Sequence, residues 1–130
     1  MKATMLFLLT ALIYAGLDLL FINGFARAFI RRQVGHLLAD KPDWAAGVVF
    51  YVLFTGGLLY FAVMPADSLM SAVKNGAFLG VLCYGTYELV NKALISGWPR
   101  SMVWVDLAWG LLAGAVTSGL AWWIKGWLNL

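Results

Sequence analysis

The amino-acid sequence predicts an all-α integral membrane protein, an antiparallel up-down bundle of four transmembrane helices. Only 12% of its 130 residues are charged and 63% are hydrophobic, whereas roughly 25% of an ordinary soluble domain is charged. Four apolar runs cover most of the chain, at about 5–22, 45–64, 74–95 and 102–124. Each is near the ~20 residues that cross a bilayer as a helix, so residues 1–130 are predicted to form a single transmembrane domain.

A basic segment, 23–44, follows the first run and is too polar to cross the membrane. Its helix-forming residues indicate that the first helix either continues into the cytoplasm or turns along the membrane surface. Pro42 breaks this helix, and Asp43 is placed to cap the second one. The segment is therefore expected to be a cytoplasmic connection between the first two spans.

The other two connections are short turns. In "PADSLMS" either Asp67 or Ser68 is expected to cap the third helix, and in "SGWPRS" Ser101 is expected to cap the fourth. Short turns between long helices favour antiparallel neighbours, so the helices should run alternately up and down.

The nine Lys and Arg residues divide unequally between the two ends of such a bundle. Six belong to the end with the first and third connections, and three to the end with both termini. Because positive residues beside a span tend to remain in the cytoplasm, both termini are predicted to lie outside it. The net charge of +3 then reflects membrane topology and gives no indication of nucleic-acid binding. Trp44, Trp98 and Trp104, near the basic end, are expected to be interfacial anchors.

Each predicted helix carries one stripe of small or polar residues when its positions are plotted at about 100° per residue. Small residues let helix backbones approach in lipid, as at Gly76 and Gly80 or at Gly110 and Gly114. The stripes should therefore face one another, or a second copy of the chain in a homodimer. They are Phe7, Ala11, Tyr14, Ala15 and Asp18 in the first helix, Gly47, Tyr51, Thr55 and Ala62 in the second, Ala77, Gly80, Tyr84, Glu88 and Asn91 in the third, and Asp106, Gly110, Ala113 and Thr117 in the fourth.

The six acidic residues fall into two groups. Three lie in turns, beside proline or at helix starts, where capping and solvation explain them. The other three are inside spans, where a lone charge costs at least ~2.5 kcal/mol: Asp18, Glu88 and Asp106. In the alternating topology these three lie roughly 6 to 10 Å inside the cytoplasmic boundary.

The similar depth of the three acids, and their places on the stripes, predict one carboxylate-rich pocket near the cytoplasmic face. Tyr51, Tyr84 and Asn91 are expected to line it as well. In a structural interpretation the acids pair with nearby Lys or Arg, or accept hydrogen bonds from Tyr and Trp, which links the helices. In a functional interpretation they form a proton carrier, a cation site or a general acid, and are the catalytic residues of any reaction.

A divalent cation such as Mg²⁺ is a narrower version of the cation site. The three acids and the oxygen of Asn91 would be hard oxygen ligands for it. The sequence contains no HExxH motif, and Asn91 stands where a di-iron Glu-x-x-His pattern would need His. No metal or cofactor is therefore predicted, although a divalent cation stays open.

Four basic residues near the predicted pocket are candidates for ligand binding: Arg31, Arg32, His36 and Arg100. Arg31 and Arg32 are expected to hold the connection in the cytoplasm and contact anionic lipid, or to bind a phosphate or carboxylate of a ligand at the pocket mouth. His36 is expected to form hydrogen bonds at the interface or to exchange protons with the acids.

Three segments together resemble an uncharacterised bacterial family of predicted membrane proteins, domain of unknown function 2177. They are "RRQVGHLLADKPD" at 31–43, "YGTYELVNKALISGWP" at 84–99 and "VDLAWG" at 105–110. The resemblance covers nearly the whole chain, and Asp18 after an apolar first helix fits it. It implies four spans and a bacterial inner membrane, and it implies no activity.

Three functions are compatible with these residues. The favoured one is binding of a lipid or other amphiphile at the cytoplasmic leaflet, with or without chemical modification of it. The second is proton-coupled transport by a homodimer, in which one acid exchanges a proton for a cationic substrate. The third is a structural or assembly role with the acids as links between helices. The residues do not decide whether the protein is an enzyme.

Overall fold

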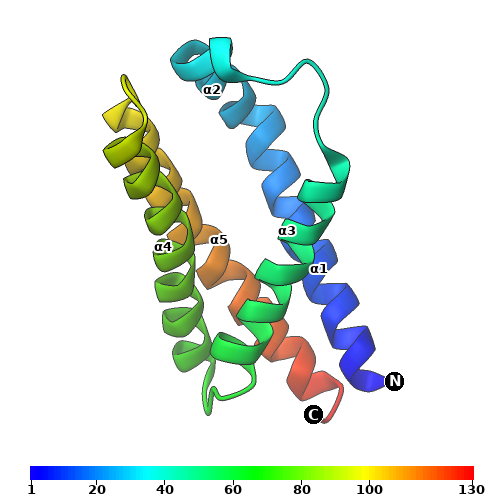
Figure 1. Ribbon diagram of the computed structural model, residues 1–130. Coiled ribbons are helices and arrows are strands. Elements are labelled where there is room, and N and C mark those ends of the chain that lie inside the picture. Colours follow the sequence, from blue (N-terminus) through cyan, green and yellow to red (C-terminus); the bar gives the residue numbers. More distant parts are fainter.

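The first helix is longer than the sequence predicts. The computed structural model describes residues 1–130, and its chain begins with α1 (Lys2–Phe21), which continues through a π-helical segment, η1 (Ile22–Ala26), into α2 (Arg27–Val34) and a 3-10 turn, η2 (Gly35–Leu37). The predicted end of the apolar run near 22 is therefore not the end of the helix. Two alternatives were predicted for the basic segment, and in the structure the first helix continues into it past the end of the apolar run (Figure 1).

The remaining helices are α3 (Trp44–Gly57) with its π-helical extension η3 (Leu58–Val63), α4 (Leu69–Leu94) and α5 (Arg100–Trp127). Asp43 caps α3 as predicted, because its Oδ1 accepts a hydrogen bond from the Ala46 amide at 3.1 Å. Ser68 caps α4, since its Oγ accepts from the Ser71 amide at 3.1 Å.

The predicted cap of the last helix is wrong. Ser101 lies inside the first turn of α5, which begins at Arg100, and Pro99 takes the capping position without a side-chain hydrogen bond. The fixed backbone of proline suits the entry to a helix, so no polar cap is required there.

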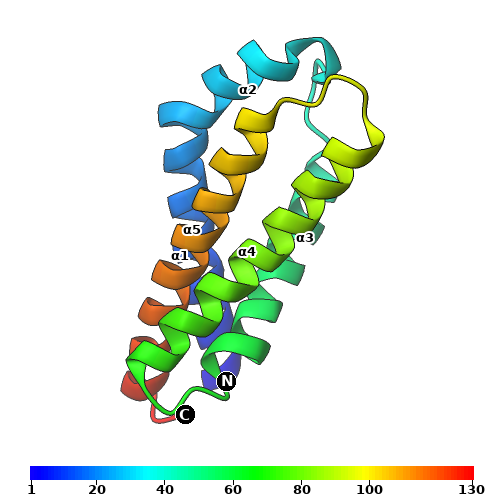
Figure 2. The ribbon, with the colours of Figure 1, turned by 90° about the vertical axis from the view of Figure 1, so that its left-hand side faces the viewer.

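The helices alternate in direction, and both termini lie at the same end of the bundle (Figures 1 and 2). At the opposite end are α2 and the turn between α4 and α5. The chain has no strand, and three of its helical stretches are long and apolar enough to cross a membrane: Lys2–Leu37, Trp44–Val63 and Arg100–Trp127. The all-α membrane fold is therefore confirmed. The helix outside this group, α4, is 26 residues long and carries Glu88.

Glycines hold α4 and α5 together along their length. A Cβ added to Gly80 would collide with the backbone of Gly110, and one added to Gly114 would collide with the backbone of Gly76. Only residues without a side chain allow such close approach of two helices. The predicted small-residue stripes of the third and fourth helices thus face each other within one chain.

The buried face of α1 is shifted from the predicted stripe. Its buried residues are Leu6, Thr10, Tyr14 and Asp18, each four positions after the last, whereas Phe7, Ala11 and Ala15 are half-buried. Tyr14 packs against α3 and α5 in the main hydrophobic core. The two residues of the predicted stripe that matter for a polar pocket, Tyr14 and Asp18, are on the buried face.

The two halves of the bundle separate toward the α2 end. α4 packs along α5, and it meets the second span at η3 and at Phe54 of α3, whose ring centroid is 5.8 Å from that of Tyr84, while α3 also packs against α1. In Figure 1, α3 and α4 diverge upward from the turn that joins them.

Candidate functional site

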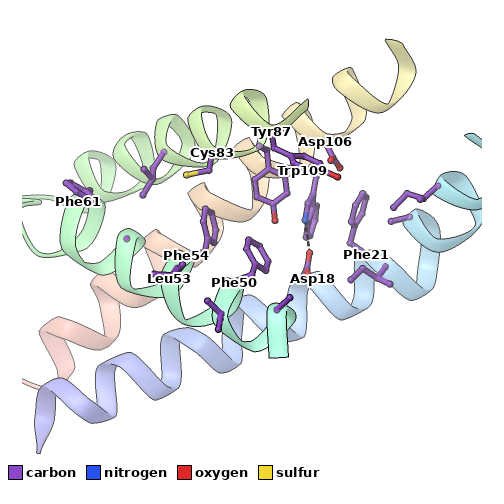
Figure 3. Close-up of a pocket in the computed structure, with 18 of the residues that line it drawn as sticks. Asp18, Phe21, Phe50, Leu53, Phe54, Phe61, Cys83, Tyr87, Asp106 and Trp109 are labelled. Atoms are coloured by element: carbon purple, nitrogen blue, oxygen red, sulfur yellow. Dashed lines mark hydrogen bonds between the residues drawn. The ribbon is translucent and has the colours of Figure 1, made fainter. Parts of the chain in front are cut away.

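A large groove occupies the space between α3 and α4. Its volume is about 1000 Å³, and 16 of its 19 lining residues are hydrophobic. It extends from Ile30 in α2 to Phe61 in η3, and its floor includes residues of α1 and α5. Figure 3 shows the carboxyl groups of Asp18 and Asp106 in the half of the groove nearer α2, with Phe21 beyond Asp18 and with Phe61 at the far end. The groove is therefore an apolar channel with two acids toward its α2 end.

Asp18 links three helices at this end of the groove. It is buried, and its Oδ2 accepts a 2.6 Å hydrogen bond from the hydroxyl of Tyr51 in α3. Its Oδ1 accepts a 3.1 Å hydrogen bond from the indole nitrogen of Trp109 in α5, drawn as a dashed line in Figure 3. The ring of Phe21 stacks on Trp109 with centroids 4.1 Å apart. These contacts fix the carboxyl group of Asp18 in the groove wall.

Glu88 is fully buried between α4 and α5. Its Oε2 accepts a 2.7 Å hydrogen bond from the indole nitrogen of Trp98, and its Oε1 has no donor. The carboxyl of Asp106 in α5 lies close to it. One buried carboxyl oxygen therefore remains without a donor beside a second carboxyl group.

A second tyrosine contact lies beside these acids. The hydroxyl groups of Tyr14 in α1 and Tyr84 in α4 hydrogen-bond to each other. Tyr84 also lines the groove, next to the end that holds the acids. Together with Tyr51 and Asp18, this bond completes a polar layer to which all four long helices contribute.

The three predicted acids lie at the same end of the bundle but divide between two places. Asp18 and Asp106 line the groove, whereas Glu88 is fully buried and is not part of the lining. Asp18 and Glu88 are buried and Asp106 is half-buried. No three His, Cys, Asp or Glu side chains gather closely enough to hold a metal ion.

The predicted basic ligands lie away from the groove. The four residues are exposed, and none of them lines it: Arg31, Arg32, His36 and Arg100. Asn91 is half-buried and also outside the lining. Lys92, four positions after Glu88 in the sequence, donates a 2.7 Å hydrogen bond to the carbonyl of Trp98. The hydrogen-bond donors to Asp18 and Glu88 are therefore tyrosine and tryptophan side chains.

Two tryptophans at the site were missed by the sequence reasoning. Trp98 is 6% exposed, so its expected role as an interfacial anchor is wrong, whereas Trp44 and Trp104 are 75% and 71% exposed. Trp109 lies three positions after Asp106, on the same face of α5, and this spacing would have indicated that it faces the acids. No comparable signal exists for Trp98, because a turn residue has no helical periodicity.

A family model described as "Predicted membrane protein (DUF2177)" matches residues 3–123 of the chain. No curated protein and no solved structure matches it. The match covers every element that builds the groove, from α1 to α5. The groove thus belongs to the part of the chain that the family model describes.

Proposed function

The chain belongs to the DUF2177 family of predicted membrane proteins, and we propose that it binds a lipid or other amphiphile in the groove between α3 and α4. The observation that carries this proposal is the groove itself. Its 16 hydrophobic lining residues suit an apolar tail, and the acids at one end suit a polar head group. A volume of about 1000 Å³ is that of a pocket for a sizeable ligand.

Access from the lipid supports an amphiphile over a water-soluble ligand. Val49 and Leu53 line the groove, yet their side chains are 56% and 69% exposed. In a membrane-spanning helix such apolar side chains face hydrocarbon, so a tail can enter sideways between α3 and α4 without crossing water. The head group then reaches Asp18 and Asp106 at the end of the groove.

The basic residues support one orientation of the protein in the membrane. Arg27, Arg31 and Arg32 lie at the α2 end of the bundle, the same end as the acids. In our proposal this end faces the cytoplasm of a bacterial cell, and both termini lie on the outer side of the inner membrane. The amphiphile would then enter from the cytoplasmic leaflet, where the exposed arginines contact anionic lipid.

Chemical modification of the amphiphile would depend on Asp106. Among the three acids it both lines the groove and lies close to a second carboxyl, so it is the acid placed to exchange a proton with a bound head group. Glu88, which is outside the lining, would act only through Asp106. Asp18, fixed by two hydrogen bonds, would position the head group.

A structural role is the second candidate, and the contacts of Asp18 favour it. The carboxyl accepts from donors on α3 and α5, so it holds three helices at one point. The structural role and amphiphile binding predict different results when the groove is filled. A purely structural Asp18 needs no ligand, whereas an amphiphile site loses its occupant when the groove is filled.

Native mass spectrometry tests amphiphile binding. The protein would be extracted from membranes in mild detergent, and bound molecules would appear as added mass. Val49→Trp fills the groove and should abolish the added mass. Val52→Trp is the matched control, because Val52 is 50% exposed on the same helix but is not part of the groove lining. Equal added mass in both variants, or none in the wild type, would contradict the proposal. The same spectra give the oligomeric state and so test the homodimer expected of a transporter.

A further inference from the structure

We propose that the head group of the bound amphiphile is a protonated amine, held between Asp18 and Asp106. This inference rests on the proposed function, because it assigns the chemistry of the ligand to the same groove. It departs from the expectation that arginines bind an anionic head group.

The charges of the groove select a cation. Asp18 and Asp106 are the carboxyl-bearing residues among its lining, and no Lys, Arg or His contributes to it. An anionic head group at this end would meet negative charge and no positive charge. Arg31 and Arg32 are exposed and outside the lining, so a phosphate bound to them would leave the acids without a partner.

The acids have neutral donors but no cation. Asp18 accepts hydrogen bonds from Tyr51 and Trp109, and Glu88 accepts one from Trp98. Neutral donors stabilise a carboxylate but leave its charge in place. The Oε1 of Glu88 also has no donor, but Glu88 is fully buried and outside the groove lining, so the amine is assigned to Asp18 and Asp106. A protonated amine supplies both the missing charge and up to three hydrogen-bond donors.

Aromatic side chains beside the acids add to the attraction for an ammonium group. Trp109, Tyr84 and Tyr87 line the same groove as Asp18 and Asp106. Ring faces attract organic cations, and they attract them most strongly where water is excluded. An inorganic cation fits less well, since no three acidic or metal-binding side chains gather there and most of the groove wall is apolar.

Protection of Cys83 provides a direct test. Cys83 is the only cysteine of the chain, and it lines the groove. The protein would be reconstituted in uncharged phosphatidylcholine vesicles, and the rate of Cys83 alkylation by membrane-permeant N-ethylmaleimide would be measured. The competitors share one chain and differ in the head group: dodecylamine, dodecanol and dodecyl phosphate.

We expect dodecylamine to halve the alkylation rate at a concentration about tenfold lower than dodecanol, and dodecyl phosphate to protect least. Asp106→Asn and Asp18→Asn should reduce this preference for the amine, whereas Asp43→Asn, at the cap of α3, should keep it. Because every variant is measured in the same lipid, partitioning of the amine into the vesicles cancels in the comparison. A Leu12→Cys, Cys83→Ala protein controls for reagent access, since Leu12 is 69% exposed and outside the groove.

The protection experiment distinguishes failure of the amine assignment from failure of amphiphile binding. Equal protection by the three competitors overturns the amine assignment and leaves amphiphile binding in place. If dodecyl phosphate protects most strongly, and the Arg31→Gln, Arg32→Gln double variant loses this protection, the amine assignment is overturned in favour of an anionic head group. No protection by any competitor overturns amphiphile binding and the amine assignment together.

Discussion

The indole nitrogen of Trp98 donates a 2.7 Å hydrogen bond to Oε2 of Glu88, so a residue of the turn after α4 reaches the interior of the bundle. Trp98 is 6% exposed and Glu88 is fully buried. Trp98 also packs with Val34 and Met102 in a small hydrophobic cluster that joins α2 to the start of α5. One side chain therefore both supplies the donor to the buried carboxyl and closes this end of the bundle.

Trp98→Phe should destabilise the protein by about 1 to 2 kcal/mol, because it leaves both oxygens of Glu88 without a tryptophan donor. Thermal unfolding in detergent would measure the loss. Trp104→Phe is the control, since Trp104 is 71% exposed and should tolerate the same change. Equal stability of the two variants would show that the bond to Glu88 contributes nothing.

Gly80→Ala should destabilise the contact between α4 and α5 by about 2 kcal/mol or more. The added methyl would collide with the backbone of Gly110, and backbone atoms cannot move aside as a flexible side chain can. Gly16→Ala introduces the same methyl at a position with nothing within 4 Å. Thermal unfolding should separate the two variants clearly. If the Gly80→Ala and Gly16→Ala variants unfold at the same temperature, α4 and α5 do not pack through Gly80 and Gly110.

Asp18 and Tyr51 should be energetically coupled. Tyr51→Phe removes the 2.6 Å hydrogen bond and should cost about 1 kcal/mol in the wild-type background. In an Asp18→Leu background the same change should cost nearly nothing, because the acceptor is already absent. A double-mutant cycle from unfolding measurements gives the coupling, and Tyr60→Phe, at a residue that is 73% exposed, serves as the control. A coupling of zero would remove the structural role of this bond.

Features that depend on local chemistry were predictable from the sequence. The cap at Asp43 follows from a short polar side chain after Pro42, and the glycine pairs of α4 and α5 follow from helical spacing. The position of Asp18 on a buried face also follows from spacing. Each of these needs only one helix and its period.

Features that depend on how helices meet were not predictable. The helix pattern places Asp18, Glu88 and Asp106 at one depth, but Glu88 is fully buried and outside the groove lining, which depends on how α4 packs against its neighbours. The continuation of the first helix to Leu37 carries Arg31 and Arg32 away from the acids. The inward turn of Trp98 requires the positive φ of Gly97, 75°, which no periodicity indicates.

In our proposal an amphiphile occupies the groove between α3 and α4 with its head group at Asp18 and Asp106. An experimental density map of the protein in lipid nanodiscs, bound to a rigid antibody fragment for size, would reveal the amphiphile itself. We expect elongated density that follows the apolar wall from Phe61 and ends between the two carboxyl groups. A map in which α3 packs directly against α4 along its length, with the groove closed and no density between them, would contradict it.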